Sequence, residues 1–206
     1  MESIIKTGNS PSWFDPYASV RTDLYVLLAA LLGRPPSEEL QKVLQSLDWN
    51  EAIPDGLCQA LQALSQAGHN YPLAALEEEY DKLFVGLGSG EMVPYASWYK
   101  EKRIQSKPLA SVRSDLIRLG IVRQTESHEP EDHAAALCEV MALISQKSME
   151  VPLATQADFF QEHISWWMPN LFKDLQSAKS AEFYKKVGLF GSCLVESEKE
   201  FLNRTY

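Results

Sequence analysis

The stretch YASVRTDLYVLLAALLGRPPSEELQKVLQSL, residues 17–47, decides the fold class, because it has the pattern of two consecutive helices. Its first part places apolar residues at positions 17, 20, 24, 27, 28 and 31, the spacing of one helical face, and stops at Gly33 before two prolines. Ser37 then stands at the position of a helix N-cap, and two glutamates follow it at the positive end of the helix dipole. The sequence therefore predicts helices over 17–32 and 38–47.

The same helical spacing of apolar residues continues along the rest of the chain, and no segment alternates apolar and polar residues as a half-buried strand does. Further helices are expected at about 56–67, 72–84, 109–119, 130–146, 153–165 and 180–202. In the last of these, Gly188 and Gly191 predict a close helix crossing, because glycine inside a helix costs about 1 kcal/mol and needs a packing reason. The fold is predicted to be all-α, a helical bundle of about 8–10 helices.

Two stretches interrupt the helical pattern. Residues 85–107, VGLGSGEMVPYASWYKEKRIQSK, have no apolar period, and so long a connection in a compact domain is usually functional. The aromatic side chains of Tyr95, Trp98 and Tyr99 in this stretch either pack into the core or line a binding groove. We favour the groove for Trp98. The second stretch is the polar link 121–129, which is expected to act as a hinge near the middle of the chain. We therefore expect a single domain over 1–206, with helical halves at about 1–120 and 130–206.

Composition and charge narrow the class of protein. The 206 residues are 45% hydrophobic and 23% charged, as in a folded protein. The net charge of −9 argues against a protein that binds duplex DNA, because such binding depends mainly on neutralising the phosphates. Basic residues gather between positions 100 and 123, which predicts a bipolar surface. The apolar run VLLAALL at 26–32 is too short for a membrane span, and the first ten residues lack a signal-peptide pattern, so we expect a cytoplasmic protein.

Three cysteines occur without a CxxC spacing, so we expect reduced thiols that serve as packing residues. The glycines of GLGSG at 86–90 follow a helix and are not continued by the GK[ST] of a phosphate-binding loop, which favours a turn. No nucleophile stands out elsewhere. We therefore expect no catalytic residue and no cofactor.

The stretch HEPEDH at 128–133 allows three interpretations: a helix start, a metal site, or an acid–base pair. Pro130 suits the first position of a helix, with Glu131 and Asp132 in the first turn, and His133 would then face the core. The two histidines are five residues apart across the proline, so they cannot share a helical face as zinc ligands do. An acid–base pair would need a substrate cleft that the sequence does not reveal. The helix start is favoured, and no metal is expected.

Four motifs in order carry a resemblance to a known family: EYDKLFVG at 79–86, VPYASWY at 93–99, EPEDH at 129–133 and HISWWMPNLF at 163–172. Together they resemble the TorD/DmsD family of cytoplasmic redox-enzyme maturation chaperones. The resemblance implies an all-α protein that is not an enzyme. It would bind the twin-arginine signal peptide and the body of a molybdenum-cofactor reductase, delay its export and assist cofactor insertion. Apart from the resemblance, the polar 121–129 link would allow a homodimer formed by exchange of the C-terminal half.

The resemblance also implies which residues form the peptide site. Glu129, Pro130, Asp132 and His133 match the family's most diagnostic motif, and Tyr95, Ser97 and Tyr99 match its loop segment. The chemistry of the ligand agrees with this assignment. A twin-arginine signal peptide carries two arginines beside an apolar stretch, and carboxylates next to an apolar groove would bind both parts. On this ground we predict that Glu129, Glu131 and Asp132 meet guanidinium groups, and that Tyr95 and Trp98 anchor the apolar part.

Two other classes of protein stay open on the residues alone. One is a small helical enzyme acting on a small molecule or nucleotide, which would show turnover or a tightly bound metal. The other is a generic helical assembly scaffold, which would bind its partner without a signal peptide.

Overall fold

The computed structural model describes residues 16–47, 53–85, 90–122, 129–146 and 150–204. Within these ranges almost all regular structure is helical, and the prediction of an all-α fold is confirmed. The single sheet-like contact among them is an isolated antiparallel bridge between Tyr95 and His133. The elements are α1 (Pro16–Gly33), α2 (Glu38–Gln45), α3 (Asp55–Asn70), α4 (Leu73–Tyr80), the π-helical turn η1 (Asp81–Val85), α5 (Ala96–Glu101), α6 (Lys107–Arg118), α7 (Ala134–Gln146), α8 (Leu153–His163), α9 (Met168–Ser177) and α10 (Tyr184–Arg204).

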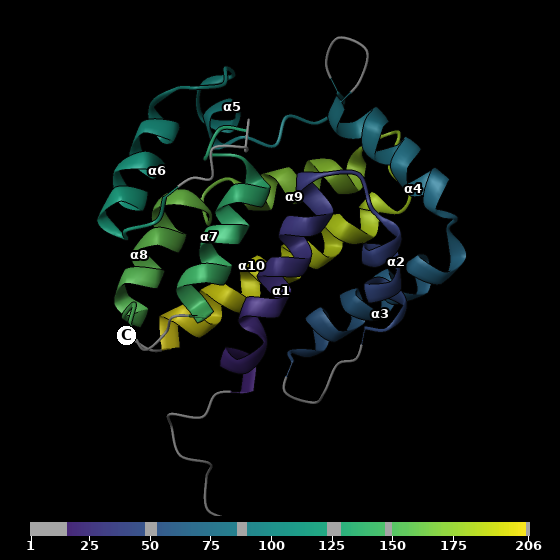
Figure 1. Cartoon of the computed structure of the whole chain (residues 1–206), viewed down its shortest axis with the longest axis horizontal. Coiled ribbons are helices and arrows are strands. Elements are labelled where there is room, and N and C mark those ends of the chain that lie inside the picture. Colours follow the sequence, from purple (N-terminus) through teal and green to yellow (C-terminus); the bar gives the residue numbers. More distant parts are fainter. Residues whose placement is uncertain (1–15, 48–52, 86–89, 123–128, 147–149, 205–206) are drawn as a thin grey trace, which may run out of the picture.

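Helices α1 and α10 occupy the middle of the molecule (Figure 1). Helix α1 packs along α7, while α10 packs against α9 and α3. Helices α2, α3 and α4 lie at one end, and α5, α6 and α8 lie at the other (Figure 1). The predicted inward face of the last helix is confirmed, because its apolar stripe is buried: Phe183, Val187, Phe190, Leu194 and Phe201.

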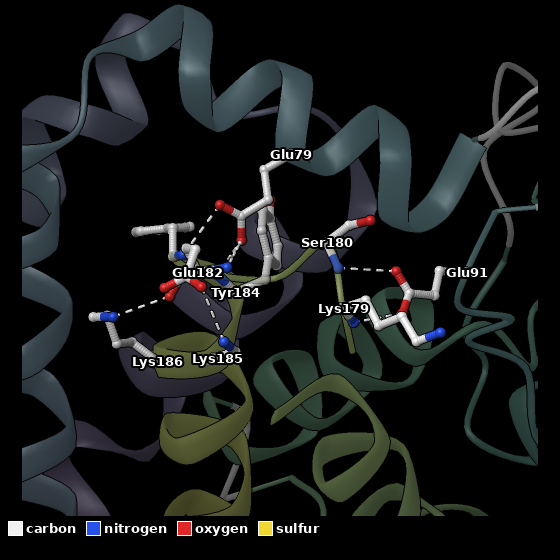
Figure 2. Close-up of polar contacts among 9 residues, drawn as sticks. Glu79, Glu91, Lys179, Ser180, Glu182, Tyr184, Lys185 and Lys186 are labelled. Atoms are coloured by element: carbon white, nitrogen blue, oxygen red, sulfur yellow. Dashed lines mark hydrogen bonds and ion pairs between the residues drawn. The ribbon is translucent and has the colours of Figure 1, made fainter. Parts of the chain in front are cut away.

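Two buried carboxylates tie distant segments together. Glu79 on α4 accepts three backbone N–H groups at the start of α10, those of Glu182, Phe183 and Tyr184, at 2.7, 3.1 and 2.7 Å. Figure 2 shows this carboxylate above the first turn of α10. The second carboxylate, Glu198 on α10, is paired with the buried Arg21 of α1.

The predicted close helix crossing is confirmed where α9 meets α10. A Cβ atom at Gly191 would lie 2.4 Å from the ring of Phe172, and one at Gly188 would lie 2.9 Å from the carbonyl oxygen of Phe172. Only a residue without a side chain fits here. Gly68 has a similar role between α2 and α3, since its Cβ would lie 2.8 Å from that of Leu44. Gly68 therefore serves this close contact, and α3 continues through it to Asn70, where a helix end was expected.

The structure corrects the expected start of α7. This helix begins at Ala134, and Pro130 is not its first residue. The preceding residues form a turn in which the N–H of His133 donates to the carbonyl of Pro130 at 3.0 Å, while the N–H of Ala134 donates to the carbonyl of Pro94 at 2.8 Å. Because this N–H group is satisfied by another segment, the helix can start four residues later.

Two further features of the structure differ from the prediction. The stretch 85–107 is not a continuous irregular connection, because it contains α5, and Trp98 and Tyr99 lie on that helix. Helix α9 is not among the helices that the sequence predicts. Most of the expected hinge, residues 123–128, and most of the GLGSG turn lie outside the described residues.

The three cysteines are free thiols, as predicted, and Cys138 is fully buried. Among the helices described, none combines the length and the apolar character needed to cross a bilayer.

Candidate functional site

The motif turn 129–133 lies directly against the start of α5, so the structure brings together two of the predicted site segments. Besides the bridge between Tyr95 and His133, the N–H of Ala96 donates to the carbonyl of Asp132 at 3.0 Å. The rings of Tyr95 and His133 meet edge to face, with centroids 4.9 Å apart. The backbone of the turn thus holds α5 in place.

Asp132 is fully buried, and its carboxylate caps α5. Its Oδ2 atom accepts the backbone N–H of Ser97 at 2.9 Å, a group that no residue of α5 itself can satisfy. The hydroxyl of Ser97, also buried, accepts the N–H of Ser106 at 3.1 Å and fixes the turn that leads into α6. Both residues therefore shape the site from the inside, and in this structure neither presents its side chain to solvent.

His133 is buried, as the sequence predicted, and it acts as a hydrogen-bond acceptor. Its Nδ1 atom accepts the N–H of Ala135 in the first turn of α7 at 3.1 Å. Burial lowers the pKa of His133 to about 4, although Glu129 and Asp132 act in the opposite direction. The imidazole is thus neutral near pH 7, which its accepting role requires.

The remaining two carboxylates of the turn reach the surface. Glu129 is exposed and accepts a hydrogen bond from the hydroxyl of Tyr95. Desolvation and this bond raise the pKa of the Tyr95 hydroxyl far above its usual range, so the hydroxyl stays a neutral donor. Glu131 is partly covered and receives the guanidinium of Arg113 from α6.

A groove of about 610 Å³ opens beside these two carboxylates, between α1, α7 and the end of α6. Four carboxylates line it: Asp23, Glu129, Glu131 and Glu139. Its apolar lining is Val26, Leu116, Ile121, Val122, Ala136, Val140, Ala142 and Leu143. The described residues that line the groove include no lysine, arginine or histidine. Desolvation raises the pKa of Glu139, and Arg34 partly offsets this effect. The groove therefore combines acidic and apolar surface, as a ligand with cationic groups beside an apolar segment requires.

The aromatic residues of α5 lie around a different hollow. Trp98 and Tyr99 line a space of about 400 Å³ together with Met92, Asp174 and neighbouring residues. The hydroxyl of Tyr99 donates to Asp174 at 2.8 Å, and its ring packs against the buried Trp167. The acidic and aromatic surfaces, expected to form one groove, are thus two separate hollows that share no lining residue among those described.

The walls of the acidic groove were missed in the sequence. Val26 and Leu143 belong to well-predicted helices, but both are exposed and lie off the core-facing stripes. Apolar residues on the solvent side of an amphipathic helix were the available signal. Glu79 was missed as well, since it sits among other glutamates that face water.

One group of side chains has the composition of a metal site, namely Asp115, Glu162 and His163, whose ligand atoms lie within 4.8 Å of one another. The Nε2 atom of His163 lies 2.6 Å from the carboxylate of Asp115, which also pairs with Arg118. Burial lowers the pKa of His163. Hydrogen bonds within the protein account for this cluster, which links α6 to α8.

A family model described as nitrate reductase delta subunit matches residues 50–173, more than half of the chain and all of α3 to α8. This chain belongs to the TorD/DmsD family. This chain is a chaperone of that family and not an enzyme, in agreement with the chaperone names of its curated relatives.

Individual relatives agree with this assignment. The chain is 22% identical to the chaperone protein TorD of Vibrio cholerae over 90% of its own length and 93% of that protein. It is 27% identical to a protein of Haemophilus influenzae described as a Tat proofreading chaperone, DmsD, over 55% of each chain. A crystal structure described as a redox enzyme maturation protein from Archaeoglobus fulgidus shares the fold, with a TM-score of 0.54 and 18% identity over 98% of this chain and 99% of that one.

Proposed function

We propose that this TorD/DmsD family member binds the twin-arginine signal peptide and the body of a molybdenum-cofactor reductase in the cytoplasm, delays its export and assists cofactor insertion. The observation that carries the proposal is the groove, in which acidic and apolar residues adjoin without a cation among the described lining. The name of the Haemophilus influenzae relative, a Tat proofreading chaperone, supports the same ligand class.

The charge of the groove fits the arginine pair of such a peptide. Glu129 and Glu131 lie at the motif turn, while Asp23 and Glu139 add carboxylates from α1 and α7. A guanidinium donates several N–H groups in a fixed plane and forms its strongest hydrogen bonds with carboxylates. We assign the arginine contacts to Glu129 and Glu131, and a positioning role to Asp132, which is buried beneath them.

The apolar wall fits the rest of the peptide. Val26 on α1 and Leu143 on α7 both line the groove and are exposed in the free protein. Burying such side chains under an apolar peptide segment stabilises a complex by about 25 cal/mol for each Å² removed from water. Trp98 and Tyr99, at the separate hollow on α5, are proposed to contact a further part of the client.

Calorimetric titration with three synthetic peptides tests the proposal. The peptides share one apolar segment and carry Arg-Arg, Lys-Lys or Gln-Gln before it. The Arg-Arg peptide is expected to bind most tightly, and Glu129→Gln should weaken it by about tenfold, because a charged hydrogen bond is lost. Glu200→Gln on α10 removes an equal charge from a surface ion pair elsewhere and serves as the control. Equal affinities for the Arg-Arg and Gln-Gln peptides would contradict the proposal.

The client and the oligomeric state need separate measurements. Capture of the chaperone from native cytosol, with the N-terminal sequence of the bound protein determined, should yield a reductase that still carries its signal peptide. Binding of a client without that peptide at equal strength would favour a general scaffold. A domain-swapped homodimer about the 121–129 link is also proposed, and light scattering should then detect a dimer in slow exchange with the monomer.

A further inference from the structure

Arg113 of α6 is paired with Glu131, one of the carboxylates that line the acidic groove. Its Nε and Nη2 atoms lie 3.0 and 2.9 Å from the same oxygen, Oε2. The side chain of Arg113 is 52% exposed and that of Glu131 is 14% exposed. Arg113 itself does not line the groove.

The two carboxylates of the motif turn that line the groove are held differently. Glu129 accepts a hydrogen bond from the hydroxyl of Tyr95, a neutral group that leaves the carboxylate charge in place. Glu131 is neutralised by a cation of the protein itself. That cation is a guanidinium, the same group that the arginines of the proposed peptide ligand carry.

We infer that Arg113 is an internal stand-in for a ligand guanidinium, which occupies Glu131 in the free chaperone and is displaced when a peptide arginine binds. This inference rests on the proposed function of the groove. Exchange of one guanidinium for another conserves the charge-assisted hydrogen bonds at Glu131, so displacement carries little local cost. The freed side chain of Arg113 is already half in solvent and can be hydrated fully.

The stand-in has two consequences. In the free protein it pairs with the largely covered carboxylate of Glu131 and stabilises its charge. In the complex it competes with the peptide for the same carboxylate and so lowers the affinity. A chaperone that must release its client to the export machinery benefits from such competition. Because the side chain of Arg113 is half exposed to water, which weakens the pair, the effect on affinity should be about two- to fivefold.

Arg113→Gln tests the inference in the intact chain, with the Arg-Arg peptide as the probe. This variant should bind the peptide about two- to fivefold more tightly than the wild type. Arg103→Gln is the matched control, because Arg103 also forms an exposed pair with a glutamate, Glu101, and its replacement removes the same charge. The control should bind like the wild type.

A double-mutant comparison ties the effect to Glu131. In the Glu131→Gln background, Arg113→Gln should no longer change the affinity, because the carboxylate for which the two guanidinium groups compete is gone. Thermal melts of all variants check that each is folded at the titration temperature.

The outcomes separate the inference from the proposed function. Binding by the wild type together with weaker or unchanged binding by Arg113→Gln would overturn the inference alone, and weaker binding would show that Arg113 positions Glu131 for the peptide. Equal gains in Arg113→Gln and Arg103→Gln would also overturn it, since they would reflect net charge only. No binding by either the wild type or Arg113→Gln would overturn both, whereas binding by Arg113→Gln alone would support the stand-in strongly.

Discussion

Glu79 and Tyr184 are 105 residues apart, yet a carboxylate oxygen of Glu79 accepts the backbone N–H of Tyr184 at 2.7 Å. The same carboxylate accepts the N–H groups of Glu182 and Phe183 (Figure 2). The first N–H groups of a helix have no partner within the helix and carry its positive dipole end. A side chain from α4 thus caps α10 and gives the glutamate of the EYDKLF motif a structural role.

Removal of this cap should destabilise the whole protein. Glu79→Ala would leave three N–H groups at the start of α10 without an acceptor, two of them buried, so we expect the free energy of unfolding to fall by about 2–4 kcal/mol. Denaturant melts followed by circular dichroism measure the change. Glu78→Ala is the control, because the neighbouring Glu78 forms only an exposed pair with Lys82. It should cost less than about 0.5 kcal/mol, and equal losses in the two variants would refute the capping role.

The contrast between these two glutamates shows what the sequence could reveal. The period of apolar residues in 72–84 predicts a helix and its buried face, because both depend on neighbours within a few turns. The partner of Glu79 lies more than a hundred residues away and is backbone, so no local pattern marks it. The late start of α7 was hidden for the same reason, since the N–H of Ala134 is satisfied by the carbonyl of Pro94.

Asp132 should contribute more to the stability of the fold than to peptide affinity. Its Oδ2 atom accepts the N–H of Ser97 within a fully buried environment. Asp132→Ala would leave that N–H without a partner, and we expect a loss of about 1–3 kcal/mol in the free energy of unfolding. Calorimetric titration of the protein that remains folded should show peptide affinity closer to wild type than that of Glu129→Gln. An unchanged melt with a large loss of affinity would instead support a direct contact.

The buried His133 should make stability depend on pH. Its pKa is about 4 in the folded chain, against 6.5 for an unperturbed histidine, so between these values the unfolded state binds a proton that the folded state does not. The contribution of His133 is therefore fully present above pH 6.5 and is lost as the pH falls towards 4, by about 3 kcal/mol in total. His163, with a lowered pKa, acts in the same direction.

A variant isolates this contribution. His133→Asn removes the titrating group and places an acceptor oxygen near the position of Nδ1, which faces the N–H of Ala135. Melts at steps between pH 7 and pH 4 should show a shallower loss of stability in the variant than in the wild type. Parallel pH curves for the two proteins would show that His133 titrates normally.

The sequence predicts only part of the candidate site. The motifs at 93–99 and 129–133 do meet, as expected, because the backbone of the turn pairs with the start of α5. Which side chains face solvent depends on the exact turn geometry, and there Asp132 turns inward while Glu129 turns outward. The groove walls on α1 and α7 depend on the packing of two helices more than a hundred residues apart, which no single segment encodes.

Leu143 provides the sharpest test of the apolar wall. It lies on α7 in the acidic groove and is 42% exposed, so a peptide can cover it while the fold depends little on it. Leu143→Ser should weaken the Arg-Arg peptide by about five- to tenfold, since much of a leucine side chain would no longer be removed from water by binding. Leu189→Ser on α10 is the matched control, because Leu189 is 40% exposed and is not part of the groove. If calorimetry gives both variants wild-type affinity while both stay folded, the peptide does not lie along α7, and the aromatic hollow around Trp98 becomes the site to test. If only Leu143→Ser loses affinity, the apolar segment of the peptide lies between α1 and α7, beside the carboxylates that receive its arginines.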